Sequence, residues 1–272
     1  GTTAQLTAAL VTANTLVVAG TATGTISDAD DVSIAATALS AIGGKTSGAI
    51  TVTNAIVITG TTAALTAALV TAGTLVVVSD AKATISDAAS TSIAATALSA
   101  IGDKTTGVVT VTNAIALSGT NTQLTAALVT TDSLVVAGTA VVTMSDAAST
   151  SIAATVLSAI GAKTSGIVTV TNAIVVTGTA AQVTAALVTT ASLVVAATAT
   201  GTISDADDVS IAATVLSAIG GKTSGAITVT NAIVVTGTTA ALTAALVTAD
   251  TLVVVSDAKA TISDAASTSI AA

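Results

Sequence analysis

The amino-acid sequence repeats itself with a period of about 59 residues, and this repetition restricts the fold more than any other feature. The segment "TVTNAIVITGTTAALTAALV" at 51–70 returns in modified form at 110–129, 169–188 and 228–247. The repeats begin near residues 6, 65, 124, 183 and 242. Because a fixed period of this length is the signature of stacked repeats, we treat residues 1–272 as one continuous array.

The sequence also has a longer period, which is equal to three repeats. Residues 20–95 match residues 197–272 with four differences, which indicates that the array grew by copying a block of three repeats. Since the chain starts and stops inside a repeat, we expect it to be an excerpt of a longer array.

Each repeat contains two related half-repeats, one of about 26 residues and one of about 33 residues. Residues 50–69 and 76–98 both have two strand-like stretches, then a polar turn and an Ala-rich segment. We therefore predict a parallel β-solenoid in which each half-repeat forms one coil of strand, strand and short helix. An all-β solenoid without helices is the alternative, because strands stack about 4.8 Å apart whereas helices pack about 8–10 Å apart.

Local patterns place the strands. Ile50–Thr53 alternates apolar and polar residues, as a strand with one buried face does. Leu75–Val78 is continuously apolar, which predicts a strand covered on both sides. Asn54 and Asp80 come next in the two half-repeats and predict corners, because both residue types tolerate a left-handed backbone.

The Ala-rich segments predict short helices. Residues 92–102 place Ala94, Ala97, Leu98 and Ile101 on one face. Ser90, Thr91 or Ser92 is expected to cap the start of this helix, and Gly102 to end it in a left-handed conformation. Residues 61–69 predict a shorter helix that depends on packing for its stability.

The residue types that are missing exclude several classes of function. The chain has no aromatic residue, Cys, His, Arg or Glu, so the usual bases, nucleophiles and oxyanion-binding groups of enzymes are largely absent. The Ser, Thr, Asp and Lys that remain recur in every repeat, whereas an enzyme normally needs one site. A net charge of −8 argues against nucleic acid. Thr, Ser, Asn or Asp interrupts every apolar run, so we expect no membrane insertion.

Two motifs resemble ligand sites and have a plainer structural explanation. The segment "SDADD" gathers three carboxylates that suit Ca²⁺. These calcium candidates are Asp28, Asp30, Asp31, Asp205, Asp207 and Asp208. The other repeats have only "SDAA" here, which favours a solvated, helix-capping turn and no bound cofactor. The segment "GGKTSG" at 43–48 lacks the glycine spacing of a phosphate loop and predicts a helix end followed by a solvated turn.

Two rows of recurring polar residues predict contacts between coils. The amides are Asn54, Asn113, Asn172 and Asn231, and the carboxylates are Asp28, Asp87, Asp146, Asp205 and Asp264. We predict a structural ladder, with the Asn54 series stacked in a row and Asp80-type residues between its members.

Outward threonines suggest a binding surface instead. The pairs are Thr51/Thr53, Thr110/Thr112, Thr169/Thr171 and Thr228/Thr230. An ice-binding face needs such a pair on every coil, about 4.8 Å apart. Val77 and Ser79 occupy the equivalent place in the alternate coil, so the predicted spacing is roughly 9.6 Å. This spacing weakens the ice-binding alternative.

The motifs "VTVTNA", "ITGTTAALTAAL", "ATISDAAST" and "ALSAIGGKTSG" resemble the tandem repeats of very large bacterial surface or secreted proteins, known as β-strand-repeat proteins. Such proteins are common in cyanobacteria and marine bacteria. The resemblance covers the whole chain and implies an extracellular, structural or adhesive role without catalytic residues. Some members also carry calcium-binding nonapeptides of the type G-G-x-G-x-D, which are absent here.

From these patterns we expect a structural repeat segment of an extracellular filament, surface layer or adhesin stalk. Its partner is expected to be itself, through end-to-end or lateral assembly, because stacked repeats bury their core only between neighbours. The alternative function is an ice- or polysaccharide-binding solenoid that uses the threonine rows.

Overall fold

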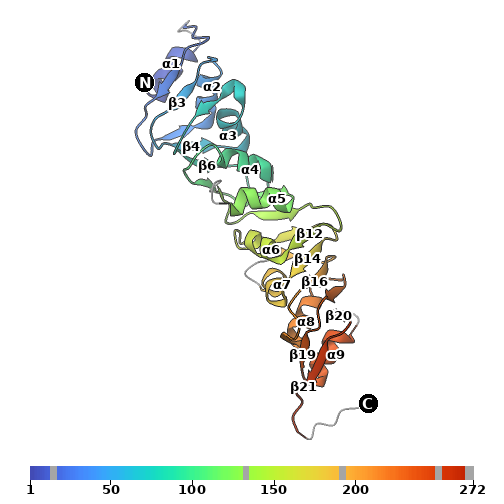
Figure 1. The fold of residues 1–272 in the computed structure, drawn as a ribbon. Helices are drawn as coiled ribbons and strands as arrows, with labels where there is room; N and C mark the ends of the chain where they lie inside the picture. The colour runs from blue at the N-terminus through green and yellow to red at the C-terminus, as the bar shows by residue number, and fades with distance from the viewer. Residues whose placement is uncertain (13–16, 131–134, 190–193, 249–252, 267–272) are drawn as a thin grey trace. The chain divides into compact units, whose positions relative to one another are not determined.

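The computed structural model describes residues 1–12, 17–130, 135–189, 194–248 and 253–266. The chain forms two compact units, an N-terminal unit of Gly1–Val141 and a C-terminal unit of Val142–Ala272. In both units parallel strands in sheets alternate with short helices, which is a repeat-like α/β arrangement. Within each unit, successive helices lie beside one another along the sheets (Figure 1).

The shorter half-repeat folds as strand, strand and helix, as predicted. Strand β3 (Ile50–Val52) buries Ile50 and Val52 and exposes Thr51, and β4 (Val57–Gly60) follows it. Helix α3 (Thr62–Leu69) buries Leu65 and Leu69, and its start is capped by Thr61, whose hydroxyl accepts a bond from the Ala64 N–H. These helices show that the all-β alternative is wrong for the described residues.

The longer half-repeat differs from the prediction because it contains three strands. They are β5 (Val76–Val77), β6 (Lys82–Ile85) and β7 (Ser92–Ala94), and helix α4 (Ala95–Gly102) comes after them. The helix was predicted to begin at Ser92. Residues 92–94 instead pair with β9 (Ala116–Gly119), and Ile93 is buried between exposed Ser92 and Ala94.

The predicted caps of α4 are also wrong. Ala94 occupies the N-cap position without any side-chain hydrogen bond. Ser90 lies earlier, in a left-handed turn with φ of 64°, and its N–H donates to the Ala114 carbonyl at 2.8 Å. Gly102 is the last helical residue, and Asp103 after it has a right-handed φ of −64°. The turn before the helix is therefore held by a contact with the next half-repeat, whereas the helix end is held by local backbone bonds to Ser99 and Ile101.

The remaining elements follow the same order. In the N-terminal unit they are α1 (Thr3–Leu10), β1 (Gly24–Ile26), β2 (Ser33–Ala35), α2 (Ala36–Gly43), a 3₁₀ turn at Ala72–Thr74, β8 (Val109–Val111), α5 (Asn121–Leu124), a π-helical turn at Thr125–Val129 and β10 (Val135–Val136). Strand β11 (Val141–Met144) begins at the last residue of this unit. In the C-terminal unit they are β12 (Ser151–Ala153), α6 (Ala154–Gly161), β13 (Val168–Val170), β14 (Val175–Gly178), α7 (Ala180–Leu187), β15 (Val194–Val195), β16 (Thr200–Ile203), β17 (Ser210–Ala212), α8 (Ala213–Gly220), β18 (Ile227–Val229), β19 (Val234–Gly237), α9 (Thr239–Leu246), β20 (Val253–Val255) and β21 (Lys259–Ile262).

The third strand of the longer half-repeat shifts the sheets sideways. In the N-terminal unit one sheet has the order β10-β8-β6-β4-β2, so β6 pairs with β4 on one side and with β8 on the other. Strand β5 pairs with β3 and ends its own sheet. Val76 is buried but Val77 is 45% exposed on the outer face of the sheet, so the prediction of a strand covered on both faces is wrong. The same order recurs in the C-terminal unit as β12-β14-β16-β18-β20.

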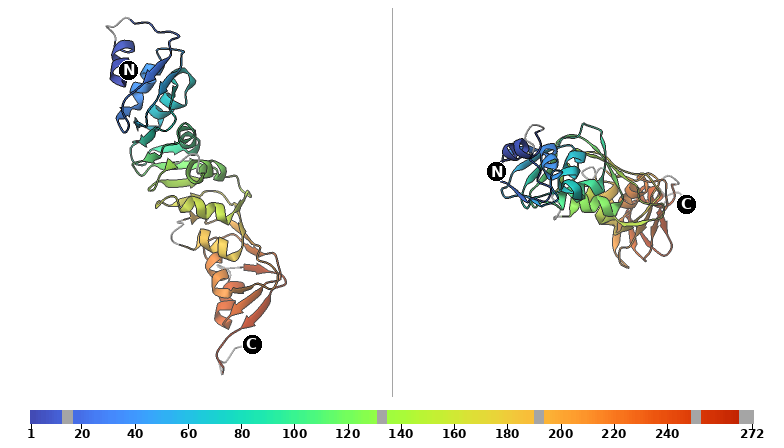
Figure 2. Two further views of the ribbon diagram at one scale, coloured as in Figure 1. Left: turned by 60° about the vertical axis from the view of Figure 1, so that its left-hand side comes forward. Right: turned by 90° about the horizontal axis from the view of Figure 1, so that it is seen from above.

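Uneven helix spacing accommodates the mismatch between strand and helix distances. Helices α2 and α3 pack closely, whereas a groove of about 530 Å³ separates α1 from α2 and β2. A groove of about 410 Å³ lies at the same place between α7 and the segment of β17 and α8. Figure 2 shows the short helices of each unit beside its strands. Tight and loose helix contacts therefore alternate while the strands keep their ladder spacing.

Candidate functional site

An aspartate in each longer half-repeat holds the start of a helix in the preceding half-repeat. The Oδ2 atom of Asp87 accepts bonds from the backbone N–H and the hydroxyl of Thr62, both at 2.7 Å. Thr62 is the first residue of α3, whose free N–H groups and helix dipole favour a negative charge. Both side chains are buried, with Asp87 only 9% exposed and Thr62 8% exposed.

The same contact recurs along the chain. It joins Asp28 to Thr3, Asp205 to Ala180 and Asp264 to Thr239, in each case across 25 residues. The predicted ladder aspartates therefore act as helix caps between half-repeats.

The asparagines bind to the same aspartates from the other side. Asn113 Nδ2 donates to the backbone carbonyl of Asp87 at 2.7 Å. Asn54, Asn172 and Asn231 reach the carbonyls of Asp28, Asp146 and Asp205 in the same way. The sequence predicted Asp80-type neighbours for the asparagines, and this detail is wrong. We call the recurring set Thr62, Asp87 and Asn113, with its equivalents, the aspartate latch.

A second recurring contact lies in the loop that follows the helix of each longer half-repeat. The Thr105 hydroxyl, 5% exposed, donates to the Ala81 carbonyl and accepts a bond from the Gly107 N–H at 3.0 Å. Gly107 lies so close to the segment between β5 and β6 that an added Cβ would be 2.4 Å from the Ala81 carbonyl oxygen. The predicted solvated turn is therefore partly buried. The recurring Thr-x-Gly spacing was the available signal for it.

The calcium candidates do not converge on a common point. Asp28 binds Thr3, Asp30 Oδ1 accepts the Ala55 N–H at 3.0 Å, and Asp31 pairs with Lys82. Asp205, Asp207 and Asp208 repeat this arrangement with Ala180, Ala232 and Lys259. No group of three potential metal-binding side chains occurs among the described residues. The arrangement therefore favours the capping turn that the sequence predicted for most repeats.

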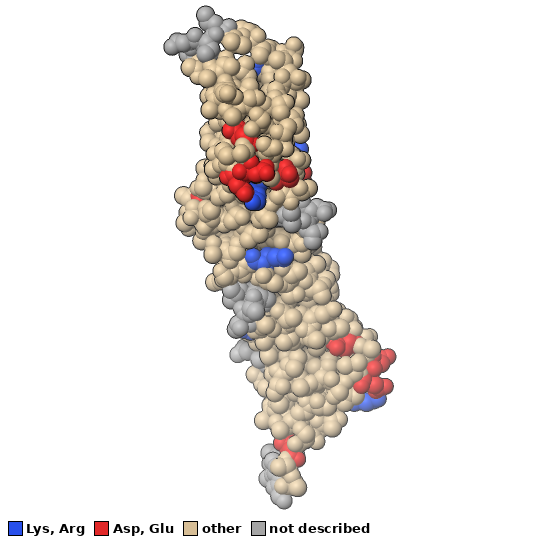
Figure 3. Space-filling view, turned by 90° about the vertical axis from the view of Figure 1, so that its left-hand side faces the viewer, with Lys and Arg blue, Asp and Glu red and all other residues tan. Residues whose placement is uncertain are grey.

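Two exposed ion pairs each join a charged turn to a strand two places along the same sheet. Lys82 Nζ lies 2.7 Å from Asp31 Oδ1, and Lys259 Nζ lies 2.7 Å from Asp208 Oδ1. Figure 3 shows carboxylates gathered beside lysines on this face. The hydrogen bond to Asp31 and then its negative charge, with a smaller effect of Asp30, raise the pKa of Lys82 above its ordinary value of 10.5.

We predict that Lys82→Met lowers the melting temperature slightly at pH 7 and low salt. A raised folded-state pKa gives stabilisation that is complete below 10.5 and is lost as the pH rises through the folded value. The difference between the variant and the wild type should therefore disappear in alkaline melts. Lys104→Met is the matched control, since Lys104 makes no ion pair with described residues, and it should show no such pH dependence.

The threonines of the sheets are arranged differently from the prediction. In register, Thr84 has Thr59 on one side and Thr110 on the other, and Thr202 lies likewise between Thr177 and Thr228. Three neighbouring strands thus carry threonine about 4.8 Å apart. The predicted doubled spacing between threonines is wrong on the Thr84 side of Thr110. On its other side the neighbour is Val136, as expected.

The second threonine of each pair is engaged by the backbone. The Thr112 hydroxyl donates to the Ile85 carbonyl at 3.0 Å. Thr53, Thr171 and Thr230 make the equivalent bond. The pairs therefore do not present two free hydroxyls.

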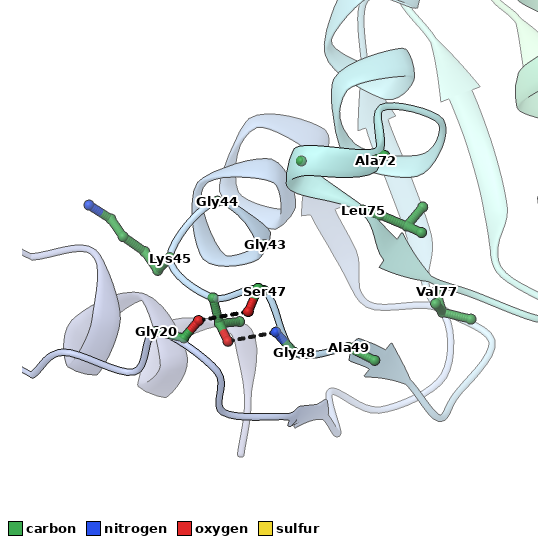
Figure 4. Close-up of a pocket in the computed structure, with 12 residues that line it drawn as sticks. Gly20, Gly43, Gly44, Lys45, Ser47, Gly48, Ala49, Ala72, Leu75 and Val77 are labelled. Carbon is green, nitrogen blue, oxygen red and sulfur yellow. Dashed lines mark hydrogen bonds between the residues drawn. The ribbon is translucent and has the colours of Figure 1, made fainter.

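The N-terminal unit also contains an open cleft of about 560 Å³. The loop Gly43–Ala49 forms one wall, and Leu75 and Val77 form the other (Figure 4). Thr46 accepts a bond from the Gly48 N–H at 2.9 Å, and Ser47 donates to the Gly20 carbonyl at 2.9 Å, so these hydroxyls support the loop itself. The described residues that line the cleft include no cluster of reactive side chains.

No family model, curated protein or solved structure matches the chain. The resemblance to bacterial surface repeats therefore rests on the sequence motifs alone. Among the described helices, none has the length and apolar character needed to cross a membrane.

Proposed function

We propose that the chain is a structural repeat segment of an extracellular filament, surface layer or adhesin stalk. In this proposal it forms a solenoid that acts through stacking and self-association and has no catalytic role. The aspartate latch is the observation that carries the proposal. Its polar side chains bind to neighbouring half-repeats, so the recurring chemistry of the sequence is used for cohesion.

The distribution of charged and polar groups supports this role. Asp28, Asp87, Asp205 and Asp264 each cap a helix in a preceding half-repeat, so these carboxylates are spread along the array. An enzyme would instead gather different reactive groups at one place. Placement outside the cell follows from the resemblance to surface repeats and belongs to the same proposal.

The proposed partner is another copy of the chain. Strands at the ends of the sheets, such as β5, have an edge that pairs with no strand of the described part of the chain. Such edges can associate with other chains, and this chain has no proline to protect them. Val77, Val136, Val195 and Val254 on these edge strands are 43–52% exposed, which adds apolar surface for association.

Negative-stain electron microscopy of the purified chain over a concentration series tests the proposal. We expect elongated assemblies that become longer or thicker as concentration rises, and sedimentation velocity should show the matching increase in mass. Separate particles of one-chain mass at every concentration would contradict self-association.

The row Thr59, Thr84 and Thr110 favours a second candidate, an ice- or polysaccharide-binding surface. Its hydroxyls repeat at the strand spacing over three strands, and Ala35 and Val136 occupy the same row on the outer strands. Inhibition of ice recrystallisation by the wild type, abolished in Thr84→Val, would support this candidate. Equal behaviour of the two chains would remove it for ice.

A further inference from the structure

The cleft of the N-terminal unit has features that match a segment of the same chain. Leu75 and Val77, which line one wall, are 37% and 45% exposed, a large exposure for apolar side chains. Lys45 lies at the opposite rim and points outward, away from both of them (Figure 4). An occupant would therefore bring an apolar group into the cleft and a negative charge to its rim.

The size of the cleft is sufficient for such an occupant. A water molecule occupies about 30 Å³ of the liquid, and the cleft encloses about 560 Å³. Gly43, Gly44 and Gly48 line the loop side and contribute no side chains to the cleft. The cleft thus has room for the tip of a tight turn with one branched apolar side chain.

The turn Asp30–Val32 has the complementary features. Asp31 has a left-handed φ of 60°, and the Val32 N–H donates to the Ala29 carbonyl at 3.2 Å, which forms a tight turn. Val32 is 39% exposed, and the Asp31 side chain is 69% exposed although it pairs with Lys82. The turn therefore presents an apolar side chain next to two carboxylates and one ammonium group.

The acidic turn and the loop that lines the cleft vary together from repeat to repeat. Two repeats contain the turn sequence "DADDV", at 28–32 and 205–209, and the loops that follow in these repeats read "GGK", at 43–45 and 220–222. The intervening repeats have "DAAST" turns, and their loops read "GDK" or "GAK". In "GDK", Asp103 places a negative charge next to Lys104 and reduces the attraction for a carboxylate. Acidic turns and Gly-Gly-Lys loops thus occur in the same repeats, three repeats apart.

We propose that the cleft between Gly43–Gly48 and β5 binds the Asp30–Val32 turn, or its equivalent at 207–209, of a second copy of this chain. Val32 enters between Leu75 and Val77, and the Asp30 and Asp31 carboxylates approach Lys45. The contact is heterologous, because a turn of one copy meets a cleft of the next, and it can continue from copy to copy. This inference rests on the proposed self-association and names the surface that carries it.

Disulfide cross-linking between single-cysteine variants tests the contact, since the chain has no cysteine of its own. Val77→Cys chains are mixed with Val32→Cys chains of distinguishable mass and treated with a mild oxidant. Thr91→Cys is the matched control, because Thr91 takes the place of Val32 in an uncharged turn. We expect about tenfold more mixed dimer with Val32→Cys than with Thr91→Cys, because a disulfide requires close and correctly oriented partners.

A charge reversal provides the second readout. Lys45→Glu in the Val77→Cys chain should reduce the mixed-dimer yield to the level of the Thr91→Cys control. Equal yields from the two turns, or an unchanged yield with Lys45→Glu, would overturn the proposal. Sedimentation of the same samples separates the outcomes: association with equal cross-linking refutes this contact alone, and monomers throughout refute the proposed self-association as well.

Discussion

Gly107→Ala should lower the free energy of unfolding by about 3 kcal/mol, near the upper end of the cost of overpacking. The new Cβ would lie 2.4 Å from the Ala81 carbonyl oxygen and 2.7 Å from its carbon, both of which are backbone atoms of the segment between β5 and β6. Relief of this clash requires the loop before β8 to move away from the segment between β5 and β6, which weakens the bond from Thr105 to the Ala81 carbonyl. Chemical denaturation followed by circular dichroism measures the change.

Gly138→Ala is the matched control for this substitution. No described atom lies within 4 Å of the position that a Cβ would take at Gly138, so the added methyl group meets open space. We expect a change within about 0.5 kcal/mol, as for most surface substitutions. If Gly107→Ala were as stable as Gly138→Ala, the close approach of Gly107 to the Ala81 carbonyl would not limit the fold.

Asp87→Ala should cost roughly 3 kcal/mol. The substitution removes the helix cap, worth about 1 kcal/mol, and leaves buried donors without an acceptor, at about 1–3 kcal/mol. The donors are the N–H and the hydroxyl of Thr62, a residue only 8% exposed. Thermal and chemical denaturation of the purified variant measure the loss.

Two further variants define the cause of this loss. Asp87→Asn keeps an acceptor oxygen but removes the negative charge, so its stability should lie between those of the wild type and Asp87→Ala. Asp80→Ala removes an exposed carboxylate whose bond joins it only to the neighbouring Ser79, and it should be nearly neutral. Equal losses for Asp87→Ala and Asp80→Ala would contradict the role of the aspartate latch.

Much of the shorter half-repeat could be predicted from its sequence. Ile50–Val52 alternates buried and exposed residues, and Thr61 and Leu65 mark a capped amphipathic helix. These signals are local, because side-chain periodicity and capping act within a few residues. The parallel arrangement followed from the fixed repeat length.

The longer half-repeat was predicted less well because its structure depends on distant contacts. Ser92–Ala94 is too short to show strand periodicity, and its identity as a strand comes from pairing with Ala116–Gly119. The sideways shift of the sheets follows from this third strand and has no local signal.

The partners of the polar residues were also hidden from local analysis. Asp87 binds Thr62, which lies 25 residues before it, and Asn113, which lies 26 residues after it. The constant spacing of these residue types across the repeats was the one sequence signal for the contacts.

Cryo-electron microscopy of the assembled chain tests the central claim, that stacked half-repeats build a structural fibre, most directly. Strands about 4.8 Å apart predict an axial period of roughly 9.6 Å for each repeat of two half-repeats. Because the acidic turns recur every third repeat, a contact between copies should add a period of roughly 29 Å or a multiple of it. Assemblies with these periods are the predicted result, and a chain that stays monomeric or packs without any period related to its repeats would contradict the account.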